Sequence, residues 1–387
     1  MRVAYDQSVS TLGDQLAVRT HDAAPELVER IDSGSTGKPR LRCHACGHRC
    51  PIPDGAMGVC KVRFNEGGRL RVPWGYVAGV QCDPIEKKPF FHAHPGALAY
   101  SFGMLGCDLH CSYCQNWVTS QALRDPDASA PPRDTTAASL VQDALRQGAA
   151  AVVSTYNEPL ITVEWAVEVF TLARQHGLLT GFVSNGNGTE QVLQYLQPHI
   201  DLYKVDLKSF DDRHYRELGG RLQPILDTIG WLHGAGVWVE IVTLLIPGFN
   251  DSDTELRGLT RFLAGVSPDI PWHVTAFHQD YRMTDTANTT AAMLQHAAAL
   301  GRDAGLRYVY AGNLPGRVGD LEHTACHECG ERVITRYGYV IRDYRITSAG
   351  TCPSCGTALP GRWSAAFNGQ AAAFPYLPHD RSRLRVI

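Results

Sequence analysis

The sequence lacks any run of about 20 consecutive apolar residues, the length that a membrane-spanning helix requires. Its first residues, MRVAYDQSVSTLGDQLAVRTHD, also lack an apolar stretch of signal-peptide length. We therefore expect a cytoplasmic chain with no part in a membrane.

A strong net charge is missing as well. The 36 Lys and Arg residues nearly balance the 39 Asp and Glu residues, which leaves a formal net charge of -3. Such a chain has no field that would gather polyanions, so nucleic acid is not an expected partner. At 387 residues and 44% hydrophobic content, the chain is long enough to bury a large core.

Cysteine, by contrast, is plentiful, with 12 residues. In a long cytoplasmic chain thiols stay reduced, so clustered cysteines indicate metal ligands rather than disulfides. Eleven of the 12 fall into three groups, and Cys82 stands alone. We expect Cys82 to be a small buried hydrophobic residue without a functional role.

The last group has the spacing of a zinc ribbon. Two short C-x2-C knuckles enclose the segment VITRYGYVIRDYRI, whose β-forming residues predict a small antiparallel ribbon. Four thiolates suit tetrahedral zinc, so we predict a structural zinc site. Its ligands would be Cys326, Cys329, Cys352 and Cys355.

The first group, CHACGHRCPIPDGAMGVC, also offers four thiolates, from Cys43, Cys46, Cys50 and Cys60. Zinc is the favoured metal here. An auxiliary iron-sulfur cluster is the alternative, because four-thiolate sites serve both metals and spacing separates them poorly. His44 and His48 are further candidate ligands, although exposed turn histidines are commoner.

The middle group has three cysteines and no fourth one nearby. Cys107, Cys111 and Cys114 lie in SFGMLGCDLHCSYCQNW, directly after a β-like run. Three thiolates leave one iron of a 4Fe-4S cluster without a protein ligand. An open coordination position is what a catalytic metal centre needs, so this group predicts chemistry rather than structure.

The pattern C-x3-C-x-aromatic-C, with Tyr113 as the aromatic residue, resembles the signature of the radical S-adenosylmethionine (SAM) superfamily. The resemblance implies that SAM chelates the fourth iron of the cluster. One electron from the cluster would then cleave SAM to methionine and a 5'-deoxyadenosyl radical, which abstracts hydrogen from a substrate.

Strand-like runs alternate with helical patterns after this group, which predicts an α/β fold with a parallel sheet. Counted with ALAYSFGM, the runs give six or seven units, similar to the partial (β/α)6 TIM-type barrel of radical SAM enzymes. The runs lie at residues 150–155, 179–185, 202–208, 237–246, 272–278 and 307–313.

We expect the barrel over residues 96–318, flanked by two metal modules. The N-terminal four-cysteine module and its connection would span 41–95, and the zinc-ribbon-like module with its tail 319–387. Residues 1–40 would be an extension, formed by a helix and a flexible connection to the first module.

The resemblance also places SAM contacts at the ends of the barrel strands, where barrel enzymes build their sites. TYNEPL occupies the place of the family's Gly-Gly-Glu-Pro motif, although Tyr156 and Asn157 replace the two glycines. Ser-Asn-Gly and Asp-Leu-Lys follow later strands, and one histidine follows the sixth. The implied contacts are Asn157, Glu158, Pro159, Ser184, Asn185, Asp206, Lys208 and His278, beside Tyr113.

Four further segments, DPIEKKPFFHAHPG, LLIPGFND, AFHQDYRM and YVYAGNLPG, extend the resemblance to AmmeMemoRadiSam-system radical SAM proteins, relatives of pyruvate formate-lyase activating enzyme. It implies a low-potential electron donor such as flavodoxin or ferredoxin, and MEMO-like and AMMECR-like partner proteins. The substrate would be a protein glycine, or alternatively a small molecule or cofactor precursor. A zinc-ribbon adaptor with a structural or redox-sensing cluster is the alternative of another class.

Overall fold

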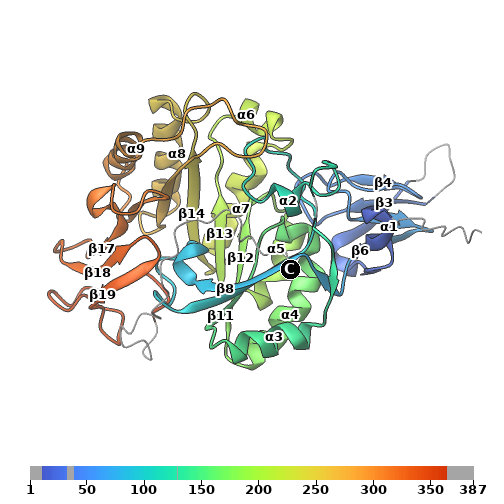
Figure 1. Cartoon of the computed structure of the whole chain (residues 1–387), viewed down its shortest axis with the longest axis horizontal. Helices are drawn as coiled ribbons and strands as arrows, with labels where there is room; N and C mark the ends of the chain where they lie inside the picture. Colours follow the sequence, from blue (N-terminus) through green and yellow to red (C-terminus); the bar gives the residue numbers. More distant parts are fainter. Residues whose placement is uncertain (1–10, 33–38, 129, 364–387) are drawn as a thin grey trace, which may run out of the picture.

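An eight-stranded, mostly parallel sheet forms the centre of this computed structural model, which describes residues 11–32, 39–128 and 130–363 (Figure 1). The edge strand β8 (Gly79–Pro84) runs antiparallel to its neighbour β9. The parallel strands, in order from β8, are β9 (Leu98–Gly103), β11 (Ala151–Ser154), β12 (Leu179–Ser184), β13 (Leu202–Asp206), β14 (Trp238–Leu245), β15 (Trp272–Ala276) and β16 (Val309–Gly312).

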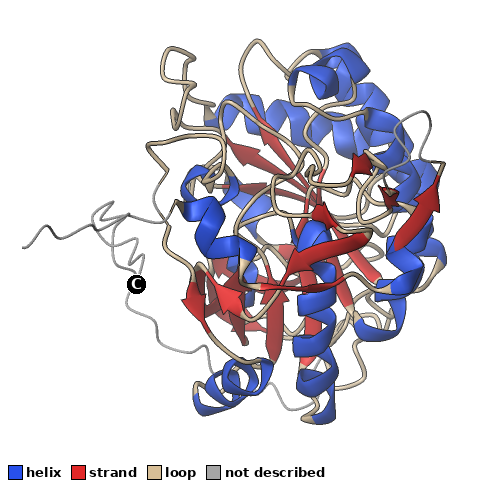
Figure 2. Ribbon diagram, turned by 90° about the vertical axis from the view of Figure 1, so that its right-hand side faces the viewer, coloured by secondary structure: helices blue, strands red, loops and turns tan. Residues whose placement is uncertain are grey.

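Helices connect the parallel strands and cover the outside of the sheet (Figure 2). The six strand–helix units and the last strand agree with the predicted partial barrel, and all six predicted strand segments are confirmed. None of the described helices combines the length and apolarity of a bilayer-crossing segment. The helices are α2 (Trp117–Ser120), α3 (Ala137–Arg146), α4 (Val163–Gln175), α5 (Glu190–Leu196), α6 (Asp212–Glu217), α7 (Leu222–Gly234), α8 (Asp253–Val266) and α9 (Ala291–Asp303).

The parallel strands are buried on both faces, as expected for a sheet whose outer face is covered by helices. All four residues of β11 and the first four of β13 are buried. Polar side chains within such strands therefore point into the interior of the barrel or into the helix layer, and they need partners there.

The N-terminal part forms two small antiparallel sheets, with strands over part of the segment where a helix was expected. Helix α1 (Leu12–Ala17) is followed by strands, and β2 pairs along its whole length with β3. Because β2 finds a pairing partner in β3, further along the chain, this contact overrides the helical preference expected for the segment that contains β2. Residues 33–38 lie outside the described residues. The sheets contain β1 (Thr20–Asp22), β6 (Arg69–Pro73) and β5 (Phe64–Glu66), and β2 (Val28–Ile31), β3 (Arg40–Cys43) and β4 (Pro51–Pro53).

A buried ion pair fastens this N-terminal part to the barrel. The two Nη atoms of Arg63 lie 2.6 and 2.8 Å from the two carboxylate oxygens of Glu164 on α4. The side chains are 1% and 4% exposed, so neither charge has water as an alternative partner. Such a pair is fixed in position because each charge needs the other.

We therefore expect Glu164→Gln to destabilise the protein by about 3 kcal/mol, because it leaves the Arg63 charge buried without its counter-charge. The measurement is the apparent melting temperature of the full chain. Glu168→Gln, an exposed position one turn further along α4, is the matched control and should change stability by less than about 0.5 kcal/mol. Equal melting temperatures for the two variants would contradict the assignment.

The predicted C-terminal ribbon is confirmed as β17 (Thr324–Ala325), β18 (Arg332–Tyr337) and β19 (Val340–Tyr344). Arg336 of this ribbon is fully buried against the barrel. Its Nη2 donates to the carbonyl of Phe91 at 2.8 Å, and its guanidinium lies 4.3 Å from the centre of the Phe91 ring. The ribbon is thus anchored to the segment that precedes β9.

Candidate functional site

The loop after β9 carries the three central cysteines. Its turn depends on Gly106, which has φ +94° and packs so tightly that a Cβ would lie 2.9 Å from the Val62 side chain. The amide of Leu109 donates to Cys107 Sγ at 3.4 Å, and Ser120 Oγ lies 3.1 Å from Cys114 Sγ. Polar groups directed at sulfur in this way stabilise metal-bound thiolates.

Burial changes the acid-base behaviour of these thiols. It raises the pKa of Cys111 to about 12 and also raises the pKa of Cys114. Without a bound cation both side chains would stay protonated near neutral pH. A bound metal centre would supply the positive charge that makes them thiolates.

Glu158 lies beside this loop as a fully buried carboxylate. Its Oε1 accepts hydrogen bonds from the Leu160 amide at 3.0 Å and from Ser184 Oγ at 2.7 Å, and its Oε2 accepts from the Asn185 amide at 2.8 Å. Burial, helped by the negative charge of Asp108, raises the pKa of Glu158 to about 8. The structure thus brings three predicted SAM contacts, from two neighbouring strands, into direct contact.

Asp206, at the end of β13, pairs with two lysines. Lys204 Nζ bonds to Asp206 Oδ1, and Lys208 Nζ lies 3.5 Å from Asp206 Oδ2. Burial alone would raise the pKa of Asp206, but the two ammonium groups outweigh it and the pKa is lowered. Lys204 was missed from the sequence, although a lysine inside the apolar strand LYKVD was a visible signal.

One cavity of about 410 Å³ unites the cysteine loop with these strand ends, where parallel barrels build their sites. Its lining also includes His273 and Tyr310. The predicted residues that line it are Cys107, Cys111, Tyr113, Cys114, Asn157, Glu158, Ser184, Asn185, Asp206 and Lys208.

Two of the predicted SAM contacts use their side chains to hold the cysteine loop. Asn157 Oδ1 accepts from the Met104 amide at 2.9 Å, and Asn185 Nδ2 donates to Asp108 Oδ1 at 2.7 Å. Asp108 is a buried carboxylate that sequence reasoning missed. Pro159 opens the single turn η4 (Pro159–Thr162) and is buried.

Tyr156 adopts the backbone conformation that glycine favours, with φ +71°. It stands where the family pattern has glycine, so the loop follows a glycine-like path despite the substitution. A non-glycine residue there stores roughly 1–3 kcal/mol of strain. Its partners hold it: Thr119 Oγ1 donates to the Tyr156 carbonyl at 2.6 Å, and Lys88 Nζ donates to the Tyr156 hydroxyl at 3.3 Å.

His278 is not among the described residues that line the cavity, but it contacts Gln115, which does line it, and its contact with SAM stays a prediction. β15 ends at Ala276, and the His278 side chain is exposed, with its Nε2 3.1 Å from Gln115 Nε2. His273, which lies within β15, lines the cavity. Its Nε2 lies 2.6 Å from Glu240 Oε2.

The segment DPIEKKPFFHAHPG, which precedes β9, reaches the cavity. Glu86, Lys88 and Phe91 line it. Lys88 is buried and donates to Asp83 Oδ2 at 3.1 Å. Cationic and aromatic groups therefore stand in the same cavity as the cysteine loop.

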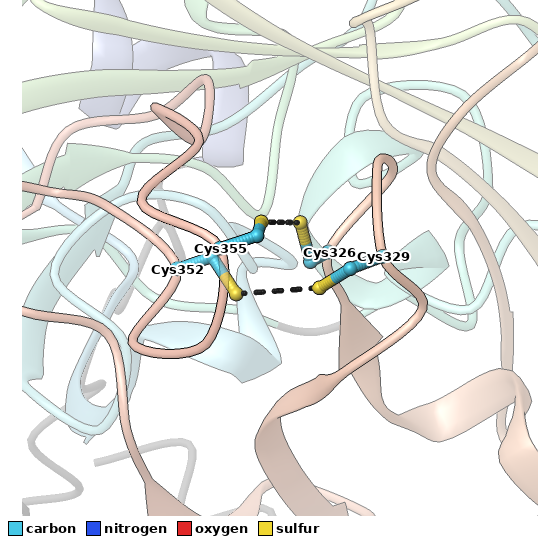
Figure 3. A group of neighbouring side chains, drawn as sticks. All are labelled: Cys326, Cys329, Cys352 and Cys355. Atoms are coloured by element: carbon cyan, nitrogen blue, oxygen red, sulfur yellow. Dashed lines mark hydrogen bonds between the residues drawn. The ribbon is translucent and has the colours of Figure 1, made fainter.

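The four C-terminal cysteines converge on one point (Figure 3). Cys326 Sγ lies 3.6 Å from Cys355 Sγ, and Cys329 Sγ lies 3.7 Å from Cys352 Sγ. Four thiolates about 2.3 Å from a tetrahedral zinc ion would stand about 3.8 Å from one another. The spacing therefore fits a single metal ion, for which zinc stays the prediction.

Comparison with known proteins identifies relatives for most of the chain. Residues 103–257 match the Radical SAM superfamily. An uncharacterised protein of Methanocaldococcus jannaschii is 33% identical over 323 residues, which are 83% of this chain and 95% of that protein. The pyruvate formate-lyase-activating enzyme of Clostridium pasteurianum is 25% identical over 200 residues, 46% of this chain and 80% of that enzyme.

The choline trimethylamine-lyase activating enzyme of Oleidesulfovibrio alaskensis is 35% identical over 107 residues, 27% of this chain and 34% of that enzyme. Among solved structures, a radical SAM methyltransferase from Sphaerobacter thermophilus aligns with TM-score 0.43 and 15% identity, over 80% of this chain and 84% of that one. The sequence matches and the three-cysteine loop lead to one conclusion: the chain belongs to the radical SAM superfamily and is related to the pyruvate formate-lyase activating enzymes.

Proposed function

We propose that this chain holds a 4Fe-4S cluster on Cys107, Cys111 and Cys114 and uses it to cleave SAM reductively. The products would be methionine and a 5'-deoxyadenosyl radical that abstracts hydrogen from a substrate. The observation that carries the proposal is the shared cavity, which is lined by the three-thiol loop, by the buried carboxylate of Glu158, and by Lys204 and Lys208. Membership of this enzyme superfamily removes the support for the adaptor alternative.

The buried charges suit the two ends of the amino-acid part of SAM. Glu158 has three protein donors on its carboxylate, which has room for about four, so an ammonium group can take the last position. Lys204 and Lys208 share one carboxylate, Asp206, which leaves one positive charge unbalanced. That charge complements a carboxylate.

We predict that Glu158→Gln weakens SAM binding about 10- to 100-fold, because the amide group carries no charge and cannot accept every hydrogen bond that the carboxylate accepts. Equilibrium dialysis of labelled SAM against the reconstituted protein measures the effect, and the iron content should stay at the wild-type value. Glu190→Gln, at an exposed position on α5, is the matched control. An unchanged SAM affinity in Glu158→Gln would remove this residue from the site.

For the substrate, we propose a glycine of a partner protein, which the related activating enzymes support. A small molecule or cofactor precursor is the second candidate, favoured by the polar wall of Lys88, His273 and Tyr310. We also propose membership of the AmmeMemoRadiSam group, a cytoplasmic location, a ferredoxin- or flavodoxin-like electron donor, and MEMO-like and AMMECR-like partners.

Isotope transfer separates the two substrate candidates. An extract of the source cells grown in heavy water is divided into a protein fraction and a small-molecule fraction, and each is added to the reduced protein with unlabelled SAM. Hydrogen abstraction places deuterium in 5'-deoxyadenosine. Deuterium from the protein fraction supports the glycine proposal, whereas deuterium from the small-molecule fraction alone would overturn it in favour of the second candidate.

A further inference from the structure

Two adjacent lysines of the segment before β9, Lys87 and Lys88, share one carboxylate. Lys87 Nζ donates to Asp83 Oδ1 at 3.1 Å, and Lys88 Nζ donates to Asp83 Oδ2 at 3.1 Å. Burial alone would raise the pKa of Asp83, but the two ammonium groups outweigh it and the pKa is lowered. Asp83 is therefore ionised at neutral pH, and the three side chains together carry one unbalanced positive charge.

Lys88 is the buried member of this group, and one of its donors has no acceptor. Its side chain is 4% exposed and lines the cavity that also contains the cysteine loop. An ammonium group donates three hydrogen bonds. Two go to Asp83 and to the Tyr156 hydroxyl, and no acceptor within the described residues takes the third. Because a buried donor without a partner costs free energy, this position favours an acceptor that enters the cavity.

The other ionisable groups nearby do not balance the charge. Asp83 and Cys82 are the groups whose charges act on Lys88, and burial raises the pKa of Cys82 to about 11, so its thiol is neutral at pH 7. Glu86 also lines the cavity, but it faces a buried counter-charge in Arg336, whose Nε lies 3.7 Å from its Oε1. The described part of the chain thus offers Lys88 one ionised carboxylate, which Lys87 shares.

SAM does not need this second positive charge. Its amino-acid part has a single carboxylate, for which the pair of Lys204 and Lys208 around Asp206 already provides an unbalanced charge. The cavity therefore has two sites with the same charge arrangement, each with two lysines on one aspartate. One of them remains for a molecule other than SAM.

The site at Lys88 borders the SAM position through Tyr156. Lys88 Nζ lies 5.3 Å from the centre of the Tyr156 ring and donates to its hydroxyl at 3.3 Å. The Tyr156 backbone belongs to the loop that carries Glu158, and Thr119, which follows the cysteine loop, donates to its carbonyl at 2.6 Å. A molecule held by Lys88 would thus lie beside the groups that we assign to SAM, which is where a hydrogen-donating substrate has to bind.

We infer that Lys88 binds an anionic group of the substrate, a carboxylate or a phosphate, and that Asp83 and Lys87 hold Lys88 in position for it. A free small molecule and an acidic or phosphorylated side chain of a protein both supply this chemistry. That the bound molecule is the substrate rests on the proposed function, whereas the binding of an anion at Lys88 does not.

Protection of the lysines from chemical modification tests anion binding without turnover. The full chain is reconstituted without oxygen and saturated with SAM, which occupies Lys204 and Lys208. It is then methylated with formaldehyde and a borane reductant, with or without inorganic phosphate or acetate, and its peptides are analysed by mass spectrometry. An anion at about twice its dissociation constant should slow the methylation of Lys88 about threefold. The exposed Lys61 is the internal control and should react at an unchanged rate.

Protection by phosphate alone or by acetate alone would support the inference and identify the preferred group. Equal methylation of Lys88 with and without both anions would overturn it. Protection of Lys88 by SAM alone would also overturn it, because the carboxylate of SAM would then occupy this lysine.

The isotope-transfer assay tests the same position during turnover, with Lys88→Met and limiting amounts of each extract fraction. The readout is the deuterated share of all 5'-deoxyadenosine formed, so a change in the rate of SAM cleavage does not affect it. We expect this share to fall about 10-fold, because a charge-assisted hydrogen bond to the substrate is lost. Arg302→Met, at an exposed position on α9, removes a positive charge elsewhere and should keep the wild-type share.

The fractions also show where the anionic group comes from. A deuterium donor in the small-molecule fraction that an anion exchanger retains supports a free anion, and a donor in the protein fraction supports an acidic or phosphorylated side chain. A small donor that passes through the exchanger, or an unchanged share in Lys88→Met, would overturn the inference. If phosphate or acetate protected Lys88 but the chain formed no 5'-deoxyadenosine, the proposed function would fall and the anion site would stand.

Discussion

Replacing Cys111 with alanine should reduce SAM cleavage to background while leaving the fold intact. Cys111 is buried among Leu109, Tyr113 and Phe277, and it lies in a loop, so its loss removes a metal ligand without breaking a helix or strand. With two thiolates left, the cluster cannot be held as the three-thiol loop requires. Iron analysis, and 5'-deoxyadenosine measured by mass spectrometry after addition of dithionite and SAM, report the result.

Cys82→Ala is the matched control for this prediction. Cys82 lies half-buried in the edge strand β8, outside the three cysteine groups. The control should keep the wild-type iron content and SAM cleavage. SAM cleavage at the wild-type rate in Cys111→Ala would contradict the assignment of the cluster to Cys107, Cys111 and Cys114.

Replacing Cys352 with alanine should lower the stability of the fold more than it lowers SAM cleavage. Structural zinc contributes folding free energy on the order of 10 kcal/mol in isolated modules. Loss of the ion should unfold the ribbon. Arg336 would then lose its contact with the buried carboxylate of Glu86, which lies 3.7 Å from its Nε. We expect one zinc fewer per chain and a large drop in apparent melting temperature. At temperatures below its lowered melting temperature, the variant should still bind iron.

Ser354→Ala, an exposed change within the same knuckle, is the control and should leave both quantities unchanged. Unaltered zinc content and melting temperature in Cys352→Ala would refute a structural metal in the ribbon.

Much of the barrel could be predicted because its strands are continuous apolar runs between helical patterns. The expected strand at 179–185 is β12 (Leu179–Ser184), and the one at 237–246 is β14 (Trp238–Leu245). The ribbon was equally visible, since its β-forming residues lie between two knuckles. In each case the signal is local.

The misses come from contacts between distant residues. Val28–Ile31 forms a strand because it pairs with Arg40–Cys43, which no local preference reveals. Arg336 looks like a surface residue of an exposed ribbon, yet it bonds to Phe91, 245 positions away.

The site shows the same division between local and distant signals. The motifs located Glu158, Ser184 and Asn185 correctly as neighbours, since strand ends meet at one edge of a parallel sheet. They did not reveal that the Asn185 side chain donates a hydrogen bond to Asp108. They also did not point to His273, which lines the cavity, because the direction of a strand side chain cannot be read from spacing.

The measurement that tests the central claim most directly is the formation of 5'-deoxyadenosine by the wild-type chain. The protein is purified and reconstituted without oxygen, and its iron and sulfide are determined. It is then incubated with SAM, with and without dithionite. The account predicts 5'-deoxyadenosine and methionine in equal amounts, formed only with the reductant. A chain that holds the cluster, binds SAM and yields no 5'-deoxyadenosine when reduced would contradict it.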